Sequence, residues 1–200
     1  MSENKQLQAL LDGCLKGDRR SQQAVYKLFY GKMKSVCMRY TRDQDQARDV
    51  LQEGFVKVFQ NLEKYTGVGS FEGWVRRIMV NMSIDRFRKL KHDFVLLGAN
   101  QDIENWKEHA EEDQEDEEDD DYIYDITPEQ IVEAMQQLSP AYRTVFNLYV
   151  FEDYSHQEIA EALGINVGTS KSNFAKARKN MKKLLIKNIK TSNEQNSPSI

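Results

Sequence analysis

Residues 155–178 read SHQEIAEALGINVGTSKSNFAKAR and predict two helices joined by a short turn. Apolar residues recur at helical spacing on both sides of Gly164, and glycine suits the left-handed residue that ends a helix. Ser155 and Glu158 have the order of a capping box, in which each side chain hydrogen-bonds the other residue's backbone amide. We therefore predict a helix-turn-helix whose first helix begins after Ser155.

The second helix of this pair is expected to start at Asn166 or Thr169 and to end near residue 188. Residues 171–190 hold eight Lys or Arg and no Asp or Glu. When such a helix enters a DNA major groove, its first residues reach base edges and its later cations lie near phosphates. A helical hairpin with a solvated basic face is the alternative, and these residues alone leave it open. His156 is expected to be a surface residue of the motif.

Helical periodicity also covers the chain on either side of its middle. Before the middle, apolar residues recur three and four apart in four runs, at residues 7–14, 25–40, 50–62 and 74–87. Asp43 and Asp45 are alternative caps of the third helix, and Ser70 is the expected cap of the fourth. Thr127-Pro128 and Ser139-Pro140 predict two further helix starts, because proline is favoured directly after an N-cap. No run alternates in the manner of a β-strand, so the predicted fold is all-α.

The net charge of −4 is unevenly distributed along the 200 residues. Residues 1–92 carry 18 basic and 10 acidic side chains, whereas residues 93–128 carry one basic and 15 acidic side chains. Eleven of the fifteen residues from Glu111 to Asp125 are acidic, and such a block repels itself and buries little apolar surface. The predicted organisation is an N-terminal helical bundle at 1–92, a flexible acidic linker at 93–128, a helix-turn-helix domain at 129–190 and a disordered tail at 191–200. The chain should therefore contain two small helical domains.

A second basic cluster lies just before the acidic linker. Its cations are Arg76, Arg77, Arg86, Arg88, Lys89 and Lys91. They are interspersed with aromatic residues and with the polar Asn81 and Asp85. This mixture suits single-stranded nucleic acid, because bases stack on rings while cations follow the backbone. Most of the aromatic residues also fit a buried stripe, and for Trp74 we expect a place in the core.

The sequence argues against catalysis, metal binding and membrane insertion. His92, His109 and His156 lie far apart, and Cys14 and Cys37 form no CxxC pair. No Gly-rich phosphate loop or nucleophile motif occurs. No run of 18 apolar residues occurs, and the N-terminus does not resemble a secretory signal. We expect a cytoplasmic protein that is not an enzyme and needs no cofactor or metal.

Six motifs follow one another across the two helical segments. They are DQARDVLQEGFVKVF at 45–59, FEGWVRRI at 71–78, NMSIDRFRK at 81–89, LSPAYR at 138–143, YSHQEIA at 154–160 and GTSKS at 168–172. The first resembles region 2.2 of bacterial sigma factors, the next two resemble regions 2.3 and 2.4, and the last three resemble region 4. With two such modules in a chain of this length, the sequence resembles the extracytoplasmic-function (ECF) group.

This resemblance implies a dissociable specificity subunit of RNA polymerase. The matching positions expected to bind core polymerase, on its β′ clamp, are Asp49, Gln52 and Glu53. Those expected to open and bind the −10 promoter element are Arg76, Arg77, Asn81, Asp85, Arg86, Arg88 and Lys89. Those expected to face the double-stranded −35 element are Thr169, Ser170, Lys171, Asn173, Lys176 and Arg178. The resemblance also implies contact with the β subunit and leads us to expect an anti-sigma factor.

The helix expected to bind the −35 element departs from the common family pattern GTVKSRLxRAR. Ser170, Asn173, Phe174 and Lys176 stand where that pattern has Val, Arg, Leu and Arg. Because Arg is often bidentate to guanine whereas Asn prefers adenine, the −35 sequence cannot be copied from the family.

The acidic linker has three possible roles. It is a simple tether, an RNA-like polyanion in the polymerase channels that the transcript later displaces, or an inhibitor that competes with DNA for the basic faces. Trp106 and the run Tyr122-Ile123-Tyr124 are unusual for a tether. A repressor or activator is the main rival function, but we find neither a dimerisation element nor an effector pocket. An adaptor built on the acidic segment would leave the six motifs unexplained.

Overall fold

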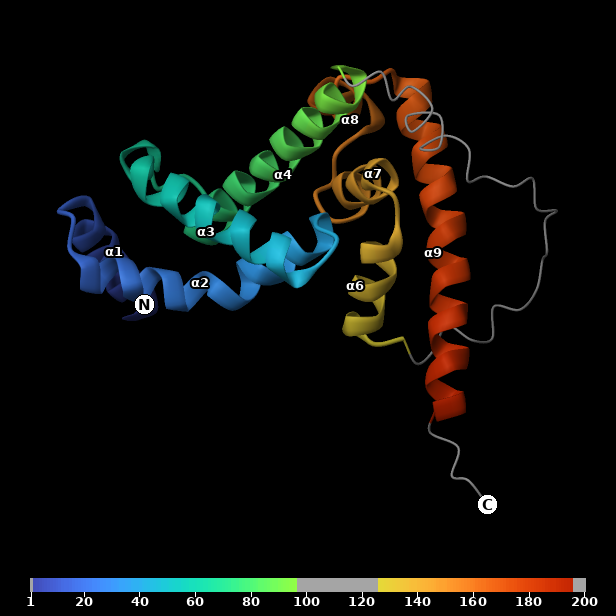
Figure 1. Cartoon of the computed structure of the whole chain (residues 1–200). Coiled ribbons are helices and arrows are strands. Elements are labelled where there is room, and N and C mark those ends of the chain that lie inside the picture. The colour runs from blue at the N-terminus through green and yellow to red at the C-terminus, as the bar shows by residue number, and fades with distance from the viewer. Residues whose placement is uncertain (1, 97–125, 196–200) are drawn as a thin grey trace. The chain divides into compact units, whose positions relative to one another are not determined.

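The computed structural model describes residues 2–96 and 126–195, and every regular element within them is a helix (Figure 1). The all-α prediction is therefore confirmed. The chain divides into two compact units, Met1–Ser83 and Ile84–Ile200, and each is described by itself. The residues predicted as the acidic linker lie outside the described residues from 97 to 125.

The N-terminal helices are α1 (Ser2–Leu15), α2 (Arg19–Tyr40), α3 (Gln44–Gln60) and α4 (Phe71–Leu96), with a short 3₁₀ turn at Leu62–Lys64. Asp18 caps α2 and Asp43 caps α3, where its carboxylate accepts from the Gln46 amide at 2.8 Å. Asp43 is thus the cap of the third helix, and Asp45 lies inside its first turn. The core includes the fully buried side chains of Met33, Leu51, Val58, Val75 and Met79.

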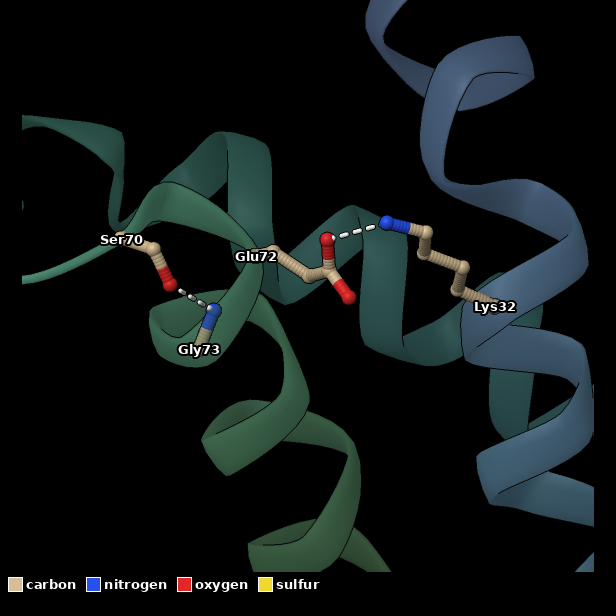
Figure 2. A network of polar contacts seen from close by, with 4 residues as sticks. All are labelled: Lys32, Ser70, Glu72 and Gly73. Atoms are coloured by element: carbon tan, nitrogen blue, oxygen red, sulfur yellow. Dashed lines mark hydrogen bonds and ion pairs between the residues drawn. The ribbon is translucent and has the colours of Figure 1, made fainter.

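The first turn of α4 is held by two polar contacts (Figure 2). The Ser70 hydroxyl accepts from the Gly73 amide at 3.0 Å, so the predicted cap is present. Lys32 of α2 donates to the Glu72 carboxylate at 2.5 Å. Both side chains of this ion pair are largely exposed, so it contributes at most about 1 kcal/mol.

The C-terminal helices are α6 (Pro128–Gln137), α7 (Pro140–Val150), α8 (His156–Leu163) and α9 (Val167–Gln195). α6, α7 and α8 each pack against α9, as Figure 1 shows for α6. Thr127 and Ser155 form capping boxes at α6 and α8, and Ser139 caps α7. All three predicted helix starts are present, because each was marked by a cap at the right distance from proline or glutamate.

One predicted helix end was wrong, because α9 continues to Gln195 through half of the predicted tail. α4 continues to Leu96, four residues beyond the predicted domain boundary at residue 92. The boundaries had been taken from changes in charge and composition. Helices tend to end where glycine or proline interrupts the backbone. Neither residue occurs between Gly73 and Gly98 or between Gly168 and Pro198.

Candidate nucleic-acid interface

The turn between α8 and α9 is set by two residues. Gly164 ends α8 with a φ of +62°, and the Ile165 amide donates back to the Ala160 carbonyl at 3.0 Å. The Asn166 side chain then accepts from the Thr169 amide at 2.6 Å and caps α9. Asn166, and not Thr169, therefore starts the second helix. The arrangement is a helix-turn-helix in which α9 is the second helix.

One side of α9 is exposed and basic. Its members, which we name the α9 face, are Lys171, Ser172, Ala175, Arg178 and Lys179. The opposite side is buried, where Ala177 and Met181 face the unit's interior. Such a helix presents short and long polar side chains to a groove while its apolar side stays on the domain.

The residues predicted to face the −35 element do not all lie on this face. Lys171 and Arg178 are exposed, whereas Thr169, Asn173 and Lys176 are half-buried and lie outside the α9 face. The prediction for Ser170 was wrong, because its side chain is 0% exposed and contacts His156. Ser170 and Lys171 are neighbours whose side chains point about 100° apart on the helix. The motif alone does not say which of the two directions faces DNA. Ser172 was missed, although it is exposed between predicted positions.

His156 is also placed differently from the prediction. Its ring is half-buried and packs against Tyr149 of α7 and Phe174 of α9, with ring centroids 4.7 and 5.8 Å away. The two aromatic rings also contact each other at 4.4 Å. His156 is therefore part of the packing between three helices and not an ordinary surface residue.

A second polar surface follows α4. Arg77, Asn81, Asp85 and Arg88 are exposed and recur four, four and three residues apart, so they form one line along the helix, which we name the α4 stripe. Asp85 and Arg88 are 3.6 Å apart. Lys89 lies beside the stripe, whereas helical spacing puts Arg76 and Arg86 on other sides of α4.

The loop before α4 carries a small aromatic cluster. Tyr65, Phe71 and Trp74 lie with ring centroids 5.2 to 5.6 Å apart. Phe71 is buried, but Trp74 is half-buried at the edge of the core, so its expected place was only partly correct. Gly67 and Gly69 both have positive φ, and the Val68 side chain between them is 86% exposed. The loop and the first turn of α4 thus hold aromatic rings close to an exposed apolar side chain in the sequence.

A third surface lies on α3. Asp49, Gln52 and Glu53 are exposed on the side opposite the buried Val50 and Val58. Val56 continues this line, because it follows Gln52 by four residues and Glu53 by three, and it is 54% exposed. We name these four residues the α3 stripe. Sequence reasoning missed Val56, although an apolar residue outside the periodic pattern was the available signal.

Metal binding, membrane insertion and thiol chemistry find no support within residues 2–96 and 126–195. No three His, Cys, Asp or Glu side chains gather there as a metal site, and none of the described helices has the length and hydropathy of a membrane span. Burial raises the pKa of the Cys37 thiol to about 12 and also raises the pKa of Cys14. Both thiols therefore stay protonated and unreactive near neutral pH.

Comparison with known families identifies both helical segments. Residues 25–92 match the family described as Sigma-70 region 2, and residues 129–181 match the family described as Sigma-70, region 4. The ECF RNA polymerase sigma factor SigW of Bacillus subtilis is 28% identical over 171 residues, which cover 85% of this chain and 91% of that protein. The chain belongs to the ECF group of sigma-70 factors.

Further relatives align along most of this sigma factor. The RNA polymerase sigma-H factor of Pseudomonas aeruginosa is 28% identical over 199 residues, covering 92% of this chain and 96% of that protein. The sigma factor RpoE, solved in complex with the anti-sigma factor NepR from Bartonella quintana, is 16% identical with a TM-score of 0.44, covering 82% and 95% of the two chains. As a sigma factor, the protein recognises promoters for RNA polymerase. Region 2 comprises most of α2 to α4, and region 4 comprises α6 to the first half of α9.

Proposed function

We propose that this sigma factor uses three exposed helix surfaces for three partners. The α9 face binds the −35 element, the α4 stripe binds the melted −10 element, and the α3 stripe binds core polymerase. The observation that carries the proposal is that each surface is exposed on a helix whose opposite side is buried, and that each has a different chemistry.

The α9 face suits double-stranded DNA. Lys171 and Arg178 supply positive charge, and both are exposed. Lys or Arg near the start of a recognition helix pairs best with guanine, whereas the half-buried Asn173 prefers adenine if it reaches a base. Later cations on the same helix lie where phosphates run.

The α4 stripe suits unpaired bases. Asn81 and Asp85 carry hydrogen-bonding groups in the middle of the stripe, and Arg77 and Arg88 lie at its ends. An amide and a carboxylate recognise the edges of bases that are no longer paired, while the flanking cations bind the backbone. At the start of the same helix, the half-buried rings of Tyr65 and Trp74 are available for stacking, and the buried Phe71 packs beneath them.

The α3 stripe suits a protein surface. Asp49 and Glu53 supply charge, Gln52 supplies an amide, and Val56 supplies an apolar contact at one end. A buried apolar contact with a polar surround is the common composition of a specific protein interface. The polymerase supplies the catalytic chemistry, so this subunit works without a catalytic site, in the cytoplasm, and an anti-sigma factor would act by covering one of these surfaces.

Run-off transcription with core RNA polymerase and the full chain tests the proposal. Lys171→Ala and Arg178→Ala should each lower initiation about 5- to 100-fold, the effect of losing one base contact, and Lys27→Ala on the exposed side of α2 should not. Asn81→Ala should leave promoter binding by the holoenzyme intact and reduce permanganate reactivity of thymines in the −10 element. A repressor or activator would give no promoter-specific transcript with core polymerase alone.

Binding to core polymerase is measured separately. Val56→Asp should weaken the affinity of the full chain for core polymerase in a fluorescence titration, because it places a charge in the apolar part of the α3 stripe. Glu63→Ala, at an exposed acidic residue of the 3₁₀ turn, is the matched control. Equal affinities for both variants would contradict the role of the α3 stripe.

A further inference from the structure

We propose that His156 and Ser170 form a lock that fixes the recognition helix α9 in the orientation needed to distinguish −35 sequences. The inference rests on the proposed role of the α9 face. His156 is the first residue of α8, and its Nδ1 lies 3.0 Å from the Oγ of Ser170 in the first turns of α9. The serine side chain is 0% exposed, so it has no contact with solvent in this position.

The imidazole is held on more than one side. Tyr149 of α7 stacks on it, with centroids 4.7 Å apart and ring planes 19° apart. Phe174 of α9 meets it edge-on, with centroids 5.8 Å apart and planes 63° apart. The two rings set the plane of the imidazole, and the contact with Ser170 sets its rotation within that plane. Three helices are therefore joined at one side chain.

The position of Ser170 makes this contact relevant to DNA recognition. Ser170 directly precedes Lys171, and each residue turns an α-helix by about 100°. Whatever fixes the direction of Ser170 also fixes the direction in which Lys171 and the rest of the α9 face point. Bidentate contacts to bases lose strength steeply when donors and acceptors are misaligned, so a small rotation of α9 should reduce discrimination between bases more than it reduces binding to phosphates.

The chemistry of the pair favours a permanent lock. A serine hydroxyl both donates and accepts, so it can pair with the neutral imidazole in either tautomer and with the charged ring. A buried hydroxyl without a partner is destabilising, and His156 supplies that partner at position 170. His156 is thus a positioning residue that acts on DNA through α9 and does not itself touch the promoter.

The test uses the reconstituted holoenzyme and two promoters, one intact and one with a base of the −35 element changed. The measured quantity is the ratio of initiation on the two. Ser170→Ala removes only the hydroxyl, and His156→Phe keeps the stacked ring but removes the nitrogen. We expect each to lower the ratio about three- to tenfold, and the double variant to lower it no further, because both remove the same contact. His156→Asn, which restores a polar atom near the Nδ1 position, should recover part of the ratio.

Stability is measured beside discrimination, as the melting temperature of each full-length variant. The lock would be overturned if the lock variants, assayed well below their melting temperatures, kept the wild-type ratio. It would also be overturned if the effects of Ser170→Ala and His156→Phe simply added in the double variant. Lys171→Ala and Arg178→Ala separate this failure from that of the proposed function. If those variants change the ratio and the lock variants do not, only the lock is wrong; if none of the four changes it, α9 does not recognise the −35 element and both proposals fall.

Discussion

The helices of the two units are specified in different ways. α2, α3 and α4 contain 22, 17 and 26 residues, whereas α6, α7 and α8 contain 10, 11 and 8. Helices as short as the second set are marginal alone, and each begins with a side-chain cap together with a proline, a capping box or both. The long helices depend more on the apolar surfaces that they bury against one another. Local signals thus define the short C-terminal helices, and packing defines the long N-terminal ones.

The buried polar residues differ in the same way. In the N-terminal unit, Thr41 and Ser83 are buried, and their hydroxyls donate to carbonyls of their own helices at 3.0 Å. In the C-terminal unit, the buried Asn147 also donates within its own helix, but the buried Arg143 and Ser170 contact helices other than their own. The C-terminal unit should therefore be more sensitive to the loss of single polar groups, and the N-terminal unit to changes in packing.

Arg143 should give the largest effect. Its guanidinium, on a residue only 4% exposed, donates to the carbonyls of Met135, Gln136 and Leu138 at 3.0, 3.0 and 2.7 Å, where α6 ends. Arg143→Met removes three charged hydrogen bonds from this turn and leaves the Met135 carbonyl only the Leu138 amide, at 3.1 Å, so we expect a loss of about 3 kcal/mol. Chemical denaturation measures the loss, and hydrogen exchange should locate it in α6 to α9.

The matched control for this change is Arg178→Met, on the exposed side of α9. It should alter stability by less than about 0.5 kcal/mol, because surface substitutions seldom do more. If the two variants were equally stable, the C-terminal unit would not be especially sensitive to the loss of a buried polar group.

The N-terminal unit is tested by two glycines that lie within helices. A Cβ added at Gly54 of α3 would lie 2.2 Å from the Sδ of the buried Met79, whereas one added at Gly31 of α2 would meet nothing within 4 Å. Gly31→Ala should stabilise the protein by up to about 1 kcal/mol, since alanine favours helix. Gly54→Ala should destabilise it by about 1 kcal/mol, because overpacking exceeds the same gain in propensity. Thermal melts compare the pair, and equal gains would mean that propensity outweighs packing even here.

Helix caps should give a smaller difference in stability between the two units. The capping box of α8 joins Ser155 and Glu158 through two reciprocal backbone bonds, whereas the cap of α3 has one bond, from the Gln46 amide to the Asp43 carboxylate. Ser155→Ala should cost about 1–2 kcal/mol and Asp43→Ala about 0.5–1 kcal/mol in urea denaturation. A larger cost at Asp43 would contradict the view that the short helices depend more on local signals.

The capping box also predicts a pH dependence. Hydrogen bonds from the Ser155 amide and hydroxyl lower the pKa of Glu158. A carboxylate with a lowered pKa in the folded protein contributes stability above its ordinary pKa and loses it as the pH falls through the lowered value. Glu158→Gln should therefore reduce stability at pH 7 and have a smaller effect in strong acid, as pH-dependent melts would show.

Most of the fold could be predicted from the sequence because its signals are local. Caps at Thr127, Ser139 and Ser155 and the glycine at 164 lie within four residues of the helix ends that they define, so they could be recognised without knowledge of the tertiary structure. The end of α9 was wrong because charge and composition do not stop a helix that lacks a breaker.

The sites were less predictable because exposure depends on packing between helices. The family resemblance implied three residues of the α3 stripe, and the basic cluster together with the resemblance gave the α4 stripe; residues three and four apart share a side of a helix. The resemblance did not distinguish Ser170 from Lys171, which are neighbours with opposite environments. The partner of Ser170 is fourteen residues away, so the motif carries no signal for it.

Substitution of Tyr142 should give the smallest effect. It should also be an exception in the C-terminal unit, because the loss of this buried polar group should stabilise the protein. The residue is 3% exposed, burial raises the pKa of its hydroxyl, and that hydroxyl has no hydrogen-bond partner among the described residues. Unlike Arg143, it keeps the desolvation cost of a polar group without a compensating bond. Tyr142→Phe should therefore raise the free energy of unfolding by up to about 1 kcal/mol, because an unpaired buried hydroxyl is removed and the ring remains. A loss of stability in urea denaturation would show that the hydroxyl is bonded in solution.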